Sequence, residues 1–266
     1  MKPEGTLHRA VIKIGGEVLL TEQGRNGLAR NTRNLVDAGW RLALLHGGGP
    51  QITRLQQRCG LVPRKVGGRR ITGPEDLLIV MQAVCGEANV RLTSALLKAG
   101  INAFGCHGAS GCLIQATKRP PRVVSGGGKE PIDFGEVGDV CGVNNGLLEA
   151  IIELGVVPVI ATLGVDRDGR VFNINADTTV VRIAAALQAE LLILTTGIGG
   201  IFRKPDDPAT RIERIHIDEL PAMISSGVIQ GGMIPKVEEA AAGLRAGIQR
   251  VAIVGADIPG AFRSVT

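Results

Sequence analysis

Short apolar runs and helical repeats alternate along this chain. Four of the apolar runs have the length and continuity of strands that are buried on both faces: 10–16, 42–45, 101–106 and 156–161. Between them apolar residues recur every three or four positions, most clearly from Pro74 to Leu96, where proline suits the first helical turn and Gly100 follows as a stop. This alternation predicts an α/β fold with a mainly parallel sheet, whose ligands bind at the carboxyl ends of the strands.

The second half of the chain repeats this alternation. Its predicted elements are a strand at 171–175, a helix at 177–187, a strand at 191–195, helices at 217–226 and 236–246, and a last strand at 250–254. The stretch 118–129 is rich in proline and glycine, so we expect a loop or a loose hairpin there. A break between Pro158 and Arg170 would divide the chain into an N-terminal lobe, 1–164, and a C-terminal lobe, 165–266.

The composition is that of a globular protein. Of the 266 residues, 44% are hydrophobic and 21% are charged, and no apolar run approaches the roughly 18 residues that a membrane-spanning helix needs. The five cysteines form no CxxC pair and no cluster with the four histidines. We therefore expect a cytoplasmic protein with reduced thiols, no membrane association and no metal ligands of its own.

The excess of basic residues, 30 against 25 acidic ones, raises the question of a nucleic-acid partner. Aromatic residues make up only 2% of the chain and tyrosine is absent, so stacking platforms for bases are scarce, and we expect no nucleic-acid binding. The densest basic clusters lie at 64–70 and 118–122. They are either solvated surface or a means of attracting an anionic substrate or an acidic partner.

The stretch from Gly47 to Gly49 joins an apolar run to a predicted helix that starts near Ile52. Unpaired backbone N–H groups and the helix dipole at such a junction favour an anion. Neither the Walker pattern nor a complete GxGxxG follows a predicted strand. Further glycine clusters occur at 15–16, 197–200 and 231–232. Each could be a tight turn, but together they suggest a backbone cradle for a highly charged ligand.

Three charged residues stand where their charge needs a partner. Lys13 lies within an apolar run, Asp177 opens a predicted helix, and Lys236 falls in the first turn of another helix, where the dipole disfavours a cation. A strand lysine that reaches solvent and a plain capping aspartate are the simpler interpretations. A shared site for a negatively charged ligand is the alternative.

Six stretches of this chain together resemble the amino acid kinase family. In order from about Val11 to Ala256 they are VIKIGG, HGGGPQI, GRRIT, IDFGEVGDV, VFNINADT and GGMIPKVE. The resemblance implies a three-layer sandwich around an open sheet, with an N-terminal lobe that binds an acyl amino acid and forms dimers and a C-terminal lobe that binds ATP with its Mg²⁺. It further implies direct transfer of the γ-phosphoryl to a carboxylate.

The resemblance also implies a role for individual residues. Lys13 and Lys236 would place positive charge on the phosphoryl from opposite sides, and Asp177 would hold both lysines. The implied ligands of the acyl amino acid are Gly15, Gly16, Gly47, Gly48, Arg70, Asn173 and Asn175. The implied ligands of the nucleotide are Thr196, Gly197, Ile198, Gly199, Gly200, Ile201, Val228, Ile229 and Gln230. The Mg²⁺ would be held by ATP.

The chain departs from the family pattern at two places. Thr196 stands where an aspartate is usual, and Gly197 and Gly200 replace bulkier residues. Ala109 and Ser110 replace charged residues in the hairpin beside the acyl site.

The expected activity is phosphorylation of the side-chain carboxylate of N-acetyl-L-glutamate, a step in arginine biosynthesis. One alternative is a kinase for glutamate or aminoadipate carried on an acidic carrier protein, and another is a non-catalytic regulator that binds nucleotide. Arginine-inhibited hexamers of the family carry an additional N-terminal helix, and only about ten residues precede the first predicted strand here. We therefore expect a homodimer without arginine feedback.

Overall fold

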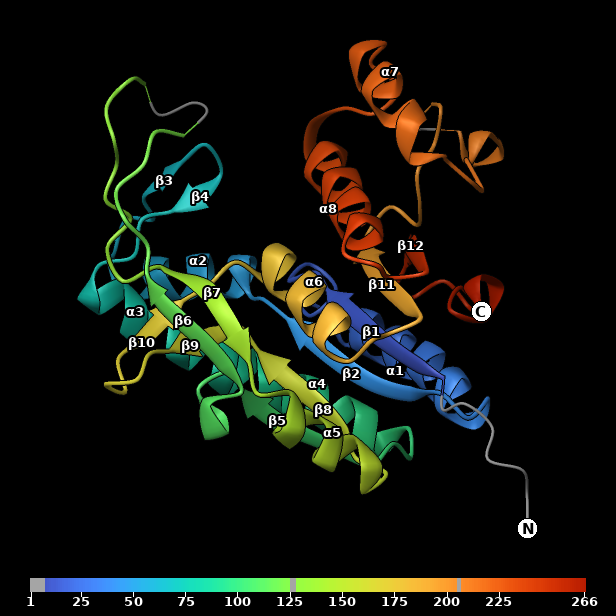
Figure 1. Cartoon of the computed structure of the whole chain (residues 1–266), viewed down its shortest axis with the longest axis horizontal. Coiled ribbons are helices and arrows are strands. Elements are labelled where there is room, and N and C mark those ends of the chain that lie inside the picture. The colour runs from blue at the N-terminus through green and yellow to red at the C-terminus, as the bar shows by residue number, and fades with distance from the viewer. Residues whose placement is uncertain (1–7, 125–127, 205–206) are drawn as a thin grey trace.

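A six-stranded parallel sheet forms the centre of the molecule (Figure 1). The computed structural model describes residues 8–124, 128–204 and 207–266. The strand order is β12-β11-β1-β2-β8-β5, and every neighbouring pair is parallel. The strands are β1 (Arg9–Ile14), β2 (Arg41–His46), β5 (Ala103–His107), β8 (Val157–Ala161), β11 (Leu191–Thr196) and β12 (Arg250–Gly255). The predicted α/β fold is confirmed.

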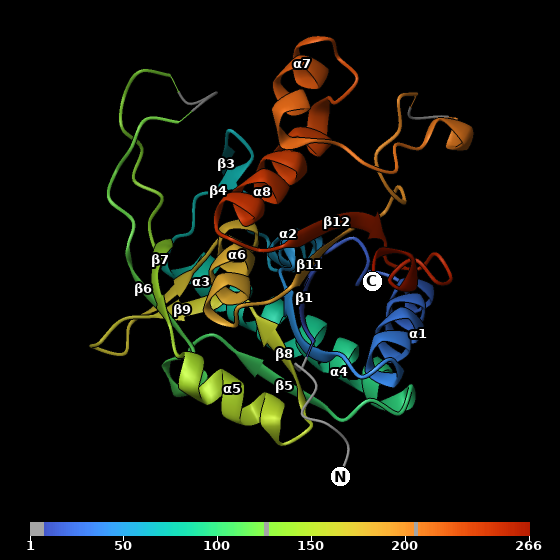
Figure 2. The same ribbon diagram turned by 45° about the vertical axis from the view of Figure 1, so that its right-hand side comes forward.

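Helices cover both faces of this sheet and give three layers (Figure 2). The helices of the chain are α1 (Glu22–Asp37), α2 (Gly49–Arg58), α3 (Pro74–Val80), α4 (Asn89–Lys98), α5 (Asn145–Glu153), α6 (Ala176–Ala186), α7 (Leu220–Ser225) and α8 (Ile234–Arg245). Of these, α1 and α4 pack on one face of the sheet and α5, α6 and α8 on the other, whereas α7 stands away from the sheet. Alternate residues of β1 enter opposite layers: Ile12 packs in the core with α1 and α4, whereas Val11 packs in the core with α5 and α6. Lys13 therefore shares the α6 side of the sheet with Val11.

The helix predicted after Gly73 is continuous but not uniform. Between α3 and α4 the segment Met81–Ala88 forms a wider, π-helical turn, which the apolar spacing did not predict. The π-helical segment places Val84 against the triple-glycine loop, residues 47–49, since a Cβ added to Gly48 would lie 2.9 Å from Val84 Cγ2. Glycine is thus the residue that fits at this close approach.

A second, smaller sheet lies beside the central one and was not predicted as a unit. Its order is β10-β9-β6-β7, with β6 (Ile114–Lys118), β7 (Gly138–Val143), β9 (Leu163–Val165) and β10 (Val171–Asn173). A short hairpin, β3 (Lys65–Val66) and β4 (Arg69–Arg70), stands next to the long arm that connects β6 with β7 (Figures 1 and 2). In that arm Arg122 pairs antiparallel with Ile132, as expected of a loose hairpin, while 125–127 lie outside the described residues.

The division into two lobes stays a prediction. The central sheet runs through both proposed lobes, because β1 pairs with β11. The predicted boundary after residue 164 falls within β9, whose partner β10 belongs to the same small sheet as β6 and β7. The helix predicted at 217–226 begins as a 3-10 turn, Ile217–Glu219, before α7. Within the described ranges no helix is both long and apolar enough to cross a membrane.

Candidate active site

Lys13 and Asp177 form an ion pair where β1 faces the first turn of α6. The lysine is only 7% exposed, and its Nζ contacts Asp177 Oδ1. Burial alone would lower the pKa of Lys13, but the negative charges of Asp177, Glu239 and Glu17 outweigh it and raise the pKa above its ordinary value. The amine is therefore a fixed positive charge inside the fold.

The glycine loops that follow β1 and β2 lie side by side because these strands are neighbours in register. Gln51 Nε2 donates to the Gly16 carbonyl oxygen at 2.8 Å, which ties the two loops together. A Cβ added to Gly16 would lie 2.7 Å from Pro50 Cδ, so the contact requires glycine. The N–H of Gly15 donates to Thr195 Oγ1 at 3.2 Å. In this structure the backbone N–H of Gly15, a residue predicted to bind the substrate, is therefore already hydrogen-bonded to a side chain.

His46 ends β2 and supports the triple-glycine loop from beneath. Its Nδ1 donates to the Gly47 carbonyl oxygen at 2.9 Å, and Asn89 Nδ2 donates to its Nε2 at 2.9 Å. Burial lowers the pKa of His46 to about 4, so the ring is neutral near pH 7 and these two bonds set its tautomer. Sequence reasoning gave His46 no role, although a histidine that ends a buried strand was a usable signal.

Arg70 contacts the triple-glycine loop, and Asn173 is hydrogen-bonded to the segment that follows Arg70. Arg70 contacts the Gly49 carbonyl oxygen at 3.3 Å and Thr53 Oγ1 at 2.9 Å, and its Nη1 contacts the buried Gln56. The two α2 side chains and the loop thus hold the guanidinium. Asn173 Nδ2 donates to Thr72 Oγ1 at 3.0 Å, two residues beyond Arg70.

Asn175 has a structural role that its prediction as a substrate ligand did not include. Its Oδ1 accepts hydrogen bonds from the N–H groups of Asp177 at 2.6 Å and Thr178 at 3.3 Å, so it caps α6. The cap orients the turn that carries Asp177 toward Lys13.

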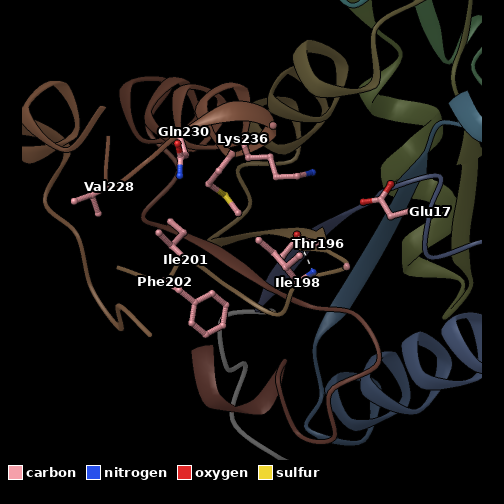
Figure 3. Close-up of a pocket in the computed structure, with 11 residues that line it drawn as sticks. Glu17, Thr196, Ile198, Ile201, Phe202, Val228, Gln230 and Lys236 are labelled. Carbon is pink, nitrogen blue, oxygen red and sulfur yellow. Dashed lines mark hydrogen bonds between the residues drawn. The ribbon is translucent and has the colours of Figure 1, made fainter. Parts of the chain in front are cut away.

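A cavity of roughly 420 Å³ opens on the other side of the site (Figure 3). Six of the nine predicted nucleotide ligands line it: Thr196, Gly197, Ile198, Ile201, Val228 and Gln230. The other three do not, because Ile229 is buried and Gly199 and Gly200 form the turn between the lining residues, with φ of 86° and 157°. Phe202 and Met233 add apolar walls that were not predicted.

Lys236 reaches this cavity from the start of α8. Figure 3 shows its amino group extended toward the side of the cavity where Glu17 lies. Within the described part of the chain Asp177 forms an ion pair with Lys13 but not with Lys236. The predicted bridging of both lysines by Asp177 therefore stays a prediction for Lys236.

Glu239 is a third carboxyl group at the site, and sequence reasoning missed it. It lies three residues after Lys236, on the same side of α8, and is 7% exposed. Burial, together with the charge of Asp177, raises the pKa of Glu239 to about 8, although Lys13 and Lys236 oppose the shift. The i,i+3 spacing from Lys236 was the available signal.

The two basic clusters of the sequence meet in space. Arg69, Arg119 and Arg122 line a cavity of about 310 Å³ together with Arg182 of α6. Its one carboxylate, Asp139, accepts two hydrogen bonds from Arg119 at 2.8 and 2.6 Å. Of the two interpretations of these clusters, attraction of an anion is the one that this grouping favours.

Comparison with known proteins decides the family. The model of the amino acid kinase family matches residues 8–255. The chain belongs to the amino acid kinase family. It is 46% identical over 250 residues to the acetylglutamate kinase of Anaeromyxobacter dehalogenans (strain 2CP-C), covering 94% of this chain and 92% of the relative. It is 42% identical over 243 residues to the acetylglutamate kinase of Methanopyrus kandleri, covering 91% and 93%.

Solved structures share this fold. The structure of smu.665 from Streptococcus mutans UA159 matches with a TM-score of 0.75 and 30% identity, over 92% of this chain and 94% of that one. Giardia carbamate kinase, at 16% identity, matches with a TM-score of 0.68 over 98% and 97% of the two chains and so supports the fold. The predicted family and fold are confirmed.

Proposed function

We propose that this protein phosphorylates the side-chain carboxylate of N-acetyl-L-glutamate with ATP, a step in arginine biosynthesis. It is then a phosphotransferase with a carboxyl group as acceptor. Relatives named acetylglutamate kinase, at 42 and 46% identity over nearly the whole chain, support this activity. The structural observation that carries the proposal is the ion pair of the buried Lys13 with Asp177, which lies between the glycine loops and the cavity that Lys236 enters.

The chemistry requires positive charge more than proton transfer. A carboxylate oxygen of the acceptor forms a bond to the γ-phosphorus, the bond from that phosphorus to the bridging oxygen breaks, and ADP leaves with the electron pair. No proton has to be removed from an ionised acceptor. Two anions must nevertheless approach each other, so fixed cations such as Lys13 and Lys236 stabilise the transition state.

The acceptor binds on the side of β2 and the small sheet in this proposal. Arg70 would hold the α-carboxylate in a bidentate contact that lysine would make poorly, and Asn173 would bind the acetylamino group or backbone of the substrate. The glycine loops would offer N–H groups to the reacting carboxylate and the phosphoryl. The arginine-lined cavity supports the proposal because its charge attracts anions toward this side of the molecule.

The nucleotide would occupy the cavity that is shown in Figure 3. Apolar side chains such as Ile201 and Met233 suit a base, while Lys236 lies at the end nearest Glu17, where the phosphates would meet the glycine loops. Mg²⁺ would enter with the phosphates. The described ranges contain no group of three His, Cys, Asp or Glu residues that could hold a metal ion.

Turnover of defined substrates tests the proposal. Purified protein with ATP, Mg²⁺ and N-acetyl-L-glutamate should produce ADP and an acyl phosphate that hydroxylamine traps in equal amounts. L-Glutamate, L-aspartate and carrier-bound aminoadipate should give much less product under the same conditions. Preferential turnover of any of these three would contradict the substrate assignment, and ATP binding without product would contradict catalysis.

We further propose a homodimer and a cytoplasmic location. Three exposed apolar side chains support the dimer: Val90 and Leu97, seven residues apart on α4, and Phe104 on the edge strand β5. All five cysteines are free thiols, which fits a reducing compartment.

A further inference from the structure

The carboxyl group of Glu239 lies against the ion pair that the mechanism uses. It packs where α8 meets α6, and it is 93% buried with neither oxygen accepting a hydrogen bond from a described residue. Its nearest charged neighbours are Asp177 on α6, Lys13 on β1 and Lys236 on its own helix, and Glu17 acts on Lys13 from the loop after β1. The proposed reaction itself gives Glu239 no task, since no proton is transferred.

Two carboxyl groups in this position need a shared proton. Asp177 lies close enough to Glu239 for its charge and hydrogen bonding to raise the pKa of Glu239. Two ionised carboxylates repel each other at that range, whereas one neutral and one ionised group form a strong hydrogen bond. Asp177 already contacts Lys13, which favours its ionised form. The proton therefore belongs on Glu239.

We propose that Glu239 is a positioning residue that acts as a neutral acid, donates its proton to Asp177 and thereby keeps Lys236 free for the phosphoryl. This inference rests on the proposed kinase activity. The local charge explains the effect. With Glu239 neutral, Lys13 and Lys236 face one negative charge, that of Asp177. With Glu239 ionised, a second carboxylate competes for Lys236 at i,i+3 spacing and cancels the charge that the transition state needs.

Ionisation of Glu239 should therefore lower the kcat of the enzyme at alkaline pH. Because burial and Asp177 raise the pKa of Glu239 to about 8, kcat at saturating substrates should fall about tenfold between pH 7 and pH 9. Glu239→Gln keeps the size of the side chain and still donates a hydrogen bond to Asp177, but it cannot ionise. This variant should match the wild type within about twofold at pH 7 and retain that rate at pH 9.

Glu238→Gln is the matched control, because Glu238 is the adjacent residue on the same helix and is exposed. It should keep the alkaline fall of the wild type. If Glu239→Gln shows the same fall as the wild type, or if it is inactive at all pH values while folded, the proposal is wrong. A purely structural role predicts loss of stability without a change in the shape of the pH profile.

The protonation state can also be measured without turnover. In protein labelled with ¹³C at the glutamate side-chain carboxyl, the signal that disappears in Glu239→Gln should titrate near pH 8. A signal that titrates near 4.5 would overturn the inference even in an active kinase. Conversely, titration near pH 8 in a protein that forms no acyl phosphate would support the shared proton and would contradict only the proposed kinase activity.

Discussion

Lys13 occupies a strand position that the sheet pattern would otherwise give to an apolar side chain. Lys13 is 93% buried and its amine is held by Asp177, so its charge is fixed before any substrate binds. Fixed charge of this kind lowers a barrier without the cost of reorganisation.

We predict that Lys13→Met lowers kcat on the order of 10² or more, because the transferring phosphoryl loses one of its two cations. The KM of N-acetyl-L-glutamate should change little, since Arg70 and Asn173 are untouched. Steady-state kinetics with ATP, Mg²⁺ and the acyl amino acid check this. Lys98→Met, on the exposed face of α4, is the control and should be fully active. A Lys13→Met enzyme with normal kcat would remove this lysine from the mechanism.

His46 gives a pH dependence of stability that can be measured on the protein alone. Its pKa of about 4 in the folded state is lower than the ordinary value of 6.5, so the unfolded chain binds more protons between these values. The stability that the neutral ring contributes is therefore present above pH 6.5 and is lost as the pH falls toward 4, by about 3 kcal/mol at most.

In urea denaturation the wild type should lose more free energy of unfolding between pH 6.5 and pH 4.5 than His46→Gln does. The exposed His216→Gln serves as the control and should follow the wild type. Parallel pH profiles for the wild type and His46→Gln would contradict the assignment of a buried neutral ring. The comparison between variants cancels the contribution of the acidic groups elsewhere in the chain.

At the scale of elements, the start of α6 connects folding with catalysis. Asn175→Ala removes both side-chain bonds to the first turn and should destabilise the protein by about 1 kcal/mol. It should also lower kcat, because the turn that carries Asp177 loses its orientation. Asn175→Ser, which can still cap, should recover most of both losses. Denaturant melts and kinetics on the same samples distinguish this from a substrate ligand, for which serine would restore stability but leave the KM high.

Sequence patterns predicted the central sheet well, because four of its strands, β1, β2, β8 and β11, are buried on both faces and read as continuous apolar runs. They did not predict the small sheet. β6 and β7 are part exposed and rich in polar residues and glycine, so their pairing is decided by tertiary contacts. The π-helical segment was missed for a related reason, since apolar spacing of three and four does not report one wide turn.

For the site, recognisable motifs gave the residues that lie at strand ends and helix starts, such as Lys13 and Asp177. They did not give Glu239, because its spacing from Lys236 alone does not show that α8 packs against α6 and buries this carboxyl group. They also could not show that the Gly15 N–H is paired with Thr195 or that Asn175 serves as a helix cap. These are contacts between segments far apart in sequence, or choices among hydrogen bonds that geometry alone decides.

At the scale of the whole molecule, the apolar surface at one edge of the central sheet bears on assembly. Val90 and Leu97 are 63% and 53% exposed on α4, and Phe104 is 49% exposed on β5, the edge strand next to that helix. An unpaired edge strand flanked by exposed apolar side chains is costly in a monomer. A second copy that covers both features removes that cost.

Light scattering should therefore give a mass about twice the 27.8 kDa of one chain. The double substitution Val90→Lys and Leu97→Lys places two charges in the proposed interface and should shift the protein to a monomer. Leu154→Lys, which adds the same charge at a residue that is 79% exposed at the end of α5, should leave the dimer intact. A monomeric wild type, or a double variant that stays dimeric, would place the assembly surface elsewhere.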